Sequence, residues 1–248
     1  MGILIESDLN KIQTHSFENT PLNKTQTVYP ILIMEPGMGP AIPDYTVLAE
    51  NMAGHGYIVV GINPTYTSNL VVFPDGRVIT RSSKGTIPDN TSPEEIDQSA
   101  NRIMAVWDQD VIFVMNMLDF INQDSTELFY QHLDLNHIGV FGHSFGGATA
   151  IAVCQQDSRC KAGANLDGTP FSAEADKLIP VPFLLMSEDY SNGCDTNCNS
   201  FRKIAENVKP GPVFDLSVRG AGHFNFTDLP LRQVPVVRPL FIAAGYSG

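Results

Sequence analysis

Gly142-His143-Ser144-Phe145-Gly146-Gly147 is the stretch that decides the fold of this chain. It puts a serine on a glycine-flanked turn, directly after the apolar run at residues 138–141 and before the helix-forming run at residues 148–155. A strand-to-helix turn this tight strains the serine backbone and presses its neighbours against other backbone, so small residues are needed at Gly142 and Gly146. We therefore predict that Ser144 is a nucleophile. The alternative is that Ser144 only caps the helix that follows.

Apolar runs typical of buried strands alternate along the chain with segments whose apolar residues recur at helical spacing. The predicted strands cover residues 29–34, 57–62, 137–141, 162–166, 183–186 and 213–218, and the predicted helices cover residues 45–53, 92–122, 146–155 and 199–207. This alternation predicts an α/β fold with a doubly wound, mostly parallel sheet and helices on both faces. Together with the serine turn it favours the α/β-hydrolase fold. We find no internal repeat and no linker of domain size, and expect residues 1–248 to form one domain.

Residues 63–90 interrupt the alternation. They are polar and rich in Gly, Pro, Ser and Thr, with one candidate hairpin about Pro74-Asp75-Gly76. We expect this segment to be a long excursion over the strand ends. The longest helix follows it, opened by Ser92-Pro93-Glu94-Glu95, which supplies an N-cap, a first-turn proline and two acids near the positive end of the helix dipole.

A serine hydroxyl needs an imidazole to take its proton and an acid to orient that imidazole. In this fold the acid and then the histidine follow the serine along the chain. Apart from His143 inside the motif, His223 is the one histidine beyond Ser144, in Gly220-Ala221-Gly222-His223 after the last strand. The acid is Asp167, which ends a strand, or Asp189, which follows the next strand, and we favour Asp167. Either aspartate could instead only initiate a turn.

Negative charge that develops on the carbonyl oxygen of an ester needs preformed hydrogen-bond donors. Two backbone N–H groups suit this role, that of Phe145 just after the serine and that of Met38 in the turn Gly37-Met38-Gly39. Tyr66, Trp107 and Phe224 are candidates for lining an acyl or aromatic pocket, although a tryptophan on a helix stripe is more often part of the core.

Composition narrows the function classes further. The chain has a formal net charge of −12 and no cluster of Lys and Arg, which argues against nucleic acid as a partner. No run of apolar residues approaches the roughly 18 to 20 needed to span a bilayer, and residues 3–5 are too short for a signal-peptide core. We expect no transmembrane segment, and nothing in the sequence indicates an oligomeric state.

Four cysteines fall in two close pairs, Cys154 with Cys160 and Cys194 with Cys198. Their spacing favours two local disulfides, each worth roughly 2 to 3 kcal/mol in the chain-entropy model. A four-cysteine zinc site and free buried thiols are the alternatives. The local disulfides favour a secreted, extracellular protein, with no signal peptide present in this chain.

The sequences GHSFGGATA, NLDG and RGAGHFNF, which begin at residues 142, 165 and 219, resemble the plasma-type (group VII) platelet-activating factor acetylhydrolases with their fungal and bacterial relatives. The likeness covers most of the chain from about Tyr29 to Asp228. It implies an acid at Asp167 and oxyanion donors at Met38 and Phe145. It also implies a calcium-independent esterase that removes short or oxidised acyl groups from the sn-2 position of phospholipids.

Two departures from that family stand out. Pro36 replaces a histidine that often precedes the first oxyanion glycine, which is harmless if the donor is a backbone N–H. The family also has strands before the Tyr29 strand and a closing helix after the histidine loop, and we expect these terminal elements to be lacking here.

Our leading hypothesis is a serine carboxylic ester hydrolase that works through an acyl-enzyme on short-acyl esters, without a cofactor or a metal. A cutinase-like polyester hydrolase that uses the same triad is the second hypothesis. The third is an inactive binding module with the α/β-hydrolase fold.

Overall fold

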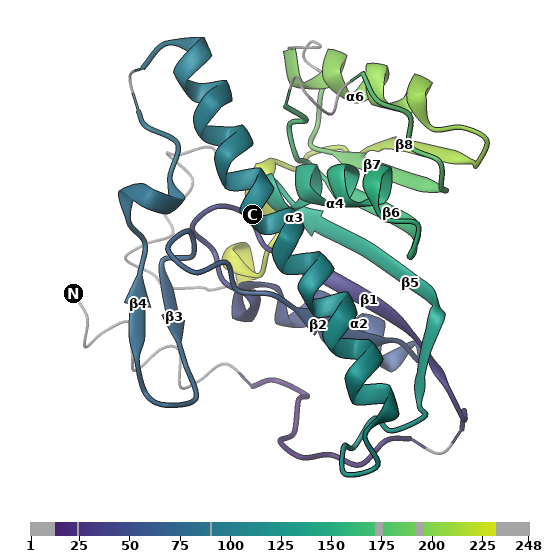
Figure 1. Cartoon of the computed structure of the whole chain (residues 1–248). Helices are drawn as coiled ribbons and strands as arrows, with labels where there is room; N and C mark the ends of the chain where they lie inside the picture. The colour runs from purple at the N-terminus through teal and green to yellow at the C-terminus, as the bar shows by residue number, and fades with distance from the viewer. Residues whose placement is uncertain (1–12, 24, 90, 172–175, 192–195, 232–248) are drawn as a thin grey trace.

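The computed structural model describes residues 13–23, 25–89, 91–171, 176–191 and 196–231. Six strands form one sheet in the order β2-β1-β5-β6-β7-β8, and every neighbouring pair is parallel. The strands are β1 (Tyr29–Glu35), β2 (Ile58–Gly61), β5 (Leu133–His143), β6 (Cys160–Leu166), β7 (Phe183–Ser187) and β8 (Val213–Ser217). Because all six run the same way, their carboxyl ends meet at one edge of the sheet (Figure 1).

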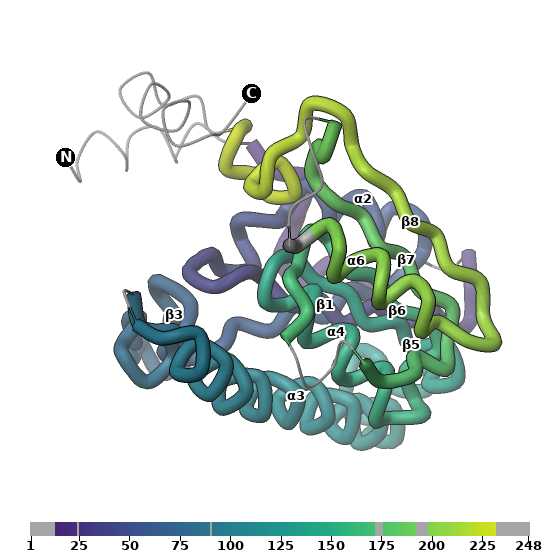
Figure 2. Tube along the Cα trace, turned by 90° about the horizontal axis from the view of Figure 1, so that it is seen from above, coloured from purple at the N-terminus to yellow at the C-terminus, as the bar shows by residue number. Residues whose placement is uncertain are grey.

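Helices cover both faces of this sheet, as predicted. The helices are α2 (Thr46–Gly54), α3 (Pro93–Gln123), α4 (Phe145–Gln156) and α6 (Thr196–Asn207). Figure 2 shows α2 and α3 on opposite sides of the sheet, with α4 on the side of α3. The long helix α3 starts at the expected cap, where the Ser92 hydroxyl accepts a hydrogen bond from Glu95 N at 3.2 Å and the Glu95 carboxylate accepts one from Ser92 N at 3.3 Å.

The strand β1 shows why the central strands read as unbroken apolar runs. Ile31 and Ile33 are fully buried in the core cluster that also contains residues of α3 and α4. Leu32 and Met34 point the other way and pack in a second cluster with Tyr45 and Phe141. Since both faces of the strand are covered, alternation between apolar and polar residues is lost.

The excursion at residues 63–90 forms the predicted hairpin, from β3 (Leu70–Val72) and the antiparallel β4 (Val78–Thr80). Its base is joined to the loop after β1, because Asn69 N donates to Gly39 O at 2.7 Å. Four short 3-10 helices complete the described elements, namely η1 (Ile42–Tyr45), η2 (Ser83–Gly85), η3 (His223–Phe226) and η4 (Leu229–Leu231).

A disulfide joins Cys154 at the end of α4 to Cys160 at the start of β6, which confirms one predicted pair. The other predicted pair includes Cys194, which lies outside the described residues. Within the described ranges, no helix has the length and apolarity that crossing a membrane requires.

Candidate active site

Three loops at the carboxyl edge of the sheet bring Ser144, Asp167 and His223 together. They follow β5, β6 and β8 respectively, so the residues lie far apart in sequence. Ser144 Oγ is 3.0 Å from His223 Nε2, and His223 Nδ1 is 2.6 Å from Asp167 Oδ2. A hydroxyl, an imidazole and a carboxylate are therefore in continuous hydrogen-bond contact.

The turn at Ser144 is strained in the way its flanking glycines indicate. Ser144 has φ 55° and ψ −122°, in a region that side-chain-bearing residues rarely adopt. A Cβ at Gly142 would lie 2.4 Å from the carbonyl carbon of Gly146, and a Cβ at Gly146 would lie 2.4 Å from Glu35 O. Only glycine fits at either position, because the obstructing atoms belong to the backbone.

The two candidate acids occupy different places. Asp167 is 6% exposed, and its second carboxylate oxygen, Oδ1, accepts a hydrogen bond from Glu188 N at 2.9 Å. Asp189 instead accepts hydrogen bonds from Gly220 N at 2.7 Å and from Ser191 N at 2.8 Å. These hydrogen bonds, with that of Gly220 first, hold the pKa of Asp189 below its usual value. Of the two aspartates, it is Asp167 that contacts the imidazole.

The turn after β1 lies directly against the serine. A Cβ at Gly37 would be 3.2 Å from Ser144 Cβ, and the next residue, Met38, packs with its side chain in the cluster that contains Phe145. Phe145 is the first residue of α4, so its N–H has no acceptor within the helix. The predicted oxyanion donors thus come from two segments that flank Ser144.

The three predicted pocket residues do not lie together. Trp107 is 1% exposed and packs edge-on against Phe145, with ring centroids 4.9 Å apart. Tyr66 and Trp107 both line a small cavity of about 280 Å³ between α3 and the excursion. Phe224 stands edge-on to the His223 ring at 5.0 Å. Whether these side chains touch a substrate remains a prediction.

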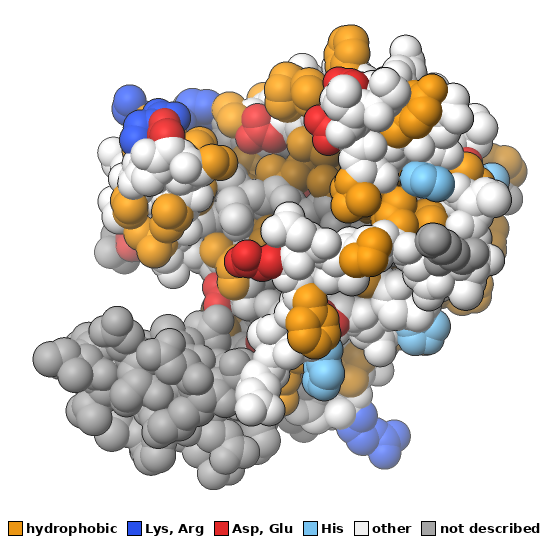
Figure 3. Space-filling view, turned by 90° about the horizontal axis from the view of Figure 1, so that it is seen from below, with side chains coloured by type: hydrophobic (Ala, Val, Ile, Leu, Met, Phe, Trp, Pro, Cys, Tyr) orange, Lys and Arg blue, Asp and Glu red, His pale blue; other side chains and the backbone are white. Residues whose placement is uncertain are grey.

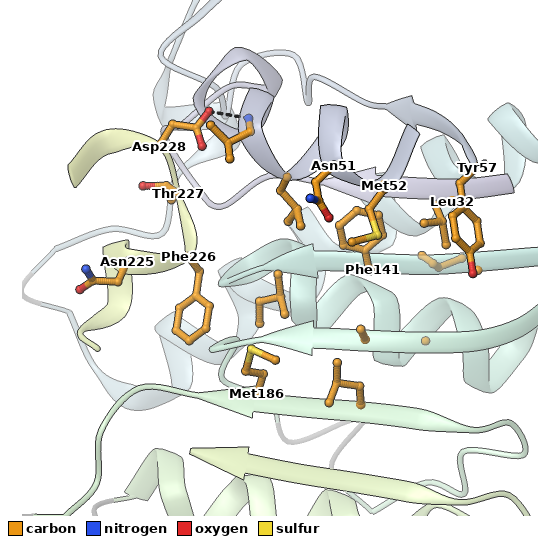
Figure 4. Close-up of a pocket in the computed structure, with 18 of the residues that line it drawn as sticks. Leu32, Asn51, Met52, Tyr57, Phe141, Met186, Asn225, Phe226, Thr227 and Asp228 are labelled. Atoms are coloured by element: carbon orange, nitrogen blue, oxygen red, sulfur yellow. Dashed lines mark hydrogen bonds between the residues drawn. The ribbon is translucent and has the colours of Figure 1, made fainter. Parts of the chain in front are cut away.

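An apolar groove of about 750 Å³ lies between α2 and the sheet, and the residues that line it include neither Ser144 nor His223. Figure 4 shows Phe226 beyond the carboxyl ends of the strands and Tyr57 at the opposite end of the groove. Hydrophobic side chains also surround a hollow on the face seen from below (Figure 3).

Three buried ionisable or polar residues near Ser144 were not singled out from the sequence: Glu35, Tyr45 and His143. Glu35 is fully buried, and neither carboxylate oxygen has a hydrogen-bond partner among the described residues. Burial raises the pKa of Glu35 well above its usual value, and the nearby carboxylates of Asp110 and Asp108 raise it further. Burial first, and His223 second, lower the pKa of His143 to about 3.

In the part of the chain that the structure describes, no three His, Cys, Asp or Glu side chains are grouped so that they could hold a metal ion. The groups gathered around Ser144 are those of nucleophilic acyl transfer, in which a hydroxyl, a base and an orienting acid act on a carbonyl.

The chain is similar in sequence to proteins that have the names of ester hydrolases. The chain is 26% identical to a platelet-activating factor acetylhydrolase of Cavia porcellus over 99% of its own length and 58% of that protein. It is 24% identical to a probable 1-alkyl-2-acetylglycerophosphocholine esterase of Arthroderma benhamiae over 81% of its length and 49% of that protein. The chain thus spans about half the length of these curated relatives.

A solved ferulic acid esterase of Streptomyces cinnamoneus superposes with a TM-score of 0.72 at 25% identity, over 92% of this chain and 64% of that one. The sheet, its helices and this neighbour define a protein of the α/β-hydrolase fold, as predicted.

Residues 93–245, more than half of the chain, match the family model described as platelet-activating factor acetylhydrolase, isoform II. The chain belongs to that family. The two relatives named above have the names of carboxylic ester hydrolases.

Proposed function

We propose that this protein is a serine carboxylic ester hydrolase that works through an acyl-enzyme. The observation that carries the proposal is the 3.0 Å separation of Ser144 Oγ and His223 Nε2, continued by the 2.6 Å contact of His223 Nδ1 with Asp167. In this arrangement the Ser144 hydroxyl donates its hydrogen bond to Nε2, and Nδ1–H donates to the carboxylate. The serine is then ready to lose its proton as it attacks.

The reaction has two halves. Ser144 Oγ attacks the ester carbonyl while His223 Nε2 takes the hydroxyl proton, and the N–H groups of Met38 and Phe145 donate to the oxyanion. When the tetrahedral intermediate collapses, His223 returns the proton to the departing alcohol and Ser144 keeps the acyl group. Water then attacks the acyl-enzyme with His223 again as base, which releases the acid and restores the serine.

The substrates that we propose are short-acyl esters, such as phospholipids with an sn-2 acetyl group. The names of the relatives support this class, since they refer to platelet-activating factor and to a 1-alkyl-2-acetylglycerophosphocholine. The ferulic acid esterase neighbour makes an aromatic acyl group the second candidate. Each class presents an ester carbonyl to the same serine.

A fluorophosphonate probe followed by mass spectrometry tests the proposed nucleophile. We expect the probe to label Ser144 in the wild type and to leave Ser144→Ala unlabelled. If neither this chain nor a longer version of the protein is labelled, the inactive binding module is the correct reading.

Initial rates on a panel then separate the substrates. The panel contains p-nitrophenyl esters of rising chain length, an sn-2 acetyl phospholipid, a ferulate ester and a polyester film. We expect the highest kcat/KM on the acetyl esters. Preference for the film or for ferulate would reject the phospholipid class.

We also propose that the protein works in an oxidising compartment or outside the cell. The disulfide between Cys154 and Cys160 supports this, because such bonds are rare in reducing cytosol. Recovery of the protein from the growth medium with that bond intact is the expected result. Recovery only from cytosol, with both cysteines reduced, would contradict it.

A further inference from the structure

Two buried polar side chains beside the proposed triad take no part in the mechanism above. Tyr45, the last residue of η1, is fully buried, and His143 is 1% exposed. Gly37 N donates to the Tyr45 hydroxyl at 2.8 Å, and that hydroxyl is 2.9 Å from His143 Nδ1. On the other side of the ring, His143 Nε2 is 2.9 Å from the carbonyl oxygen of His223. These contacts form an unbroken hydrogen-bonded bridge from Gly37 through Tyr45 and His143 to the backbone of His223.

The two ends of this bridge determine where each proton lies. A backbone N–H can only donate, so the Tyr45 oxygen accepts from Gly37 and uses its own proton to donate to His143 Nδ1. A carbonyl can only accept, so His143 Nε2 carries the hydrogen that it donates to His223 O. One neutral tautomer of His143, protonated at Nε2, satisfies both ends.

We infer that Tyr45 and His143 are positioning residues, which hold the turn that carries Met38 and the backbone of His223 at a fixed separation across Ser144. The inference rests on the proposed function, because it assigns a catalytic meaning to the separation. The bridge begins at Gly37, one residue before the proposed donor Met38, and it ends on the peptide of the proposed base. Displacement at either end moves a reacting group relative to Ser144 Oγ.

The neutral state of the bridge suits this position. The rings of His143 and His223 are only 4.6 Å apart between centroids. When His223 takes a proton from the serine, a neutral His143 presents no second positive charge to it. An ionised ring would have no lone pair at Nδ1 to accept the Tyr45 proton, so the Tyr45 hydroxyl could no longer be the donor in that contact.

Removing a single hydroxyl tests the bridge with little change in shape. We expect Tyr45→Phe to lower kcat on p-nitrophenyl acetate by about 10- to 100-fold and to change KM by less than about threefold, since a misplaced reacting group affects chemistry more than binding. Tyr29→Phe is the matched control, because Tyr29 is also buried and its hydroxyl donates to the backbone oxygen of Asn23. It should lose stability without loss of kcat.

Substitutions of His143 add a rescue and a coupling test. Gln has both a donor and an acceptor, so His143→Gln should stay within about threefold of the wild-type kcat, whereas His143→Leu should match Tyr45→Phe. Combining Tyr45→Phe with His143→Leu should reduce kcat no more than either change alone, because both break one bridge. Unchanged kcat in Tyr45→Phe, or fully additive losses in the double variant, would overturn the inference.

A crystal structure of Tyr45→Phe gives a result that does not depend on activity. We expect Gly37 or His223 to move and the contact between Ser144 Oγ and His223 Nε2 to lengthen beyond hydrogen-bonding distance. Unchanged positions of both residues would refute the bridge even if the wild type is an esterase. Conversely, if the wild type hydrolyses no ester, the proposed function is refuted. The crystal structure of Tyr45→Phe still tests the bridge in that case.

Discussion

The carboxylate of Asp189 holds Gly220, with Oδ2 accepting a hydrogen bond from the Gly220 N–H at 2.7 Å. Asp189 N also donates to Ala221 O at 2.9 Å. Asp189 is therefore joined by two hydrogen bonds to the loop that leads to His223. The aspartate that anchors the loop and the aspartate that contacts the imidazole are therefore different residues. Asp167 contacts the ring itself.

This division predicts unequal effects of the same substitution. Asp167→Asn should lower kcat by about 10³- to 10⁴-fold, because an amide no longer fixes the tautomer of His223 or offsets its positive charge. Asp189→Asn should retain most activity, since its amide oxygen can still accept from Gly220. Steady-state kinetics with circular dichroism to verify folding provides the measurement. A larger loss in Asp189→Asn would transfer the orienting role to Asp189.

The close packing around the serine turn predicts that Gly146→Ala is strongly destabilising. The added Cβ would meet the carbonyl oxygens of Glu35 and Pro36 at 2.4 Å each, and backbone cannot move aside as a side chain can. We expect a loss of about 3 kcal/mol or more in the free energy of unfolding, at or above the range for overpacked cores.

Gly54→Ala is the matched control for that loss. Gly54 is the last residue of α2, and a Cβ there would have nothing within 4 Å. Alanine should stabilise the protein by about 0.5 to 1 kcal/mol because it restricts the unfolded chain. Urea unfolding measures the change in the free energy of unfolding for both variants. Equal changes in the two variants would contradict the predicted clash at Gly146.

The sheet and the turn that carries Ser144 could be predicted because their signals are local. The apolar runs define the strands, the Ser92 cap defines the start of α3, and the glycines around Ser144 define the turn. His223 followed from chain order and from its being the remaining histidine. Each of these inferences needs only residues that are neighbours in sequence or a general rule of connectivity.

The bridge through Tyr45 and His143 could not be predicted in this way. His143 contacts one residue 98 positions away and another 80 positions away, and no spacing rule links them. Asp167 and Asp189 were likewise ambiguous because both follow a strand, and only side-chain direction distinguishes them. Glu35 gave a weak signal, as a charged residue that ends an apolar run buried on both faces.

The buried carboxyl of Glu35 predicts a pH-dependent difference in stability. Burial raises its pKa in the folded protein above the usual value of 4.5. The folded state therefore keeps a proton that the unfolded chain has lost once the pH exceeds that value. Compared with Glu35→Gln, the wild type should lose about 1.4 kcal/mol of unfolding free energy per pH unit above it, until the folded-state pKa is reached.

Urea unfolding of wild type and Glu35→Gln at pH 5, 6 and 7 checks this slope. Glu127→Gln is the control, because it removes one carboxyl group from an exposed position. If the wild type and Glu35→Gln differ by a constant amount at all three pH values, Glu35 is ionised in the folded protein.

The imidazole of His143 predicts a pH dependence of the opposite sign. Burial lowers its pKa from 6.5 to about 3, so between these values the unfolded chain binds a proton that the folded protein excludes. As the pH falls through this range, the wild type should lose about 1.4 kcal/mol of unfolding free energy per unit relative to His143→Gln, which has no titrating group there. Parallel stability curves for wild type and His143→Gln between pH 6 and pH 4 would contradict this prediction. They would mean that His143 gains its proton in the folded protein. Burial would then not keep His143 in the neutral tautomer that accepts the Tyr45 proton.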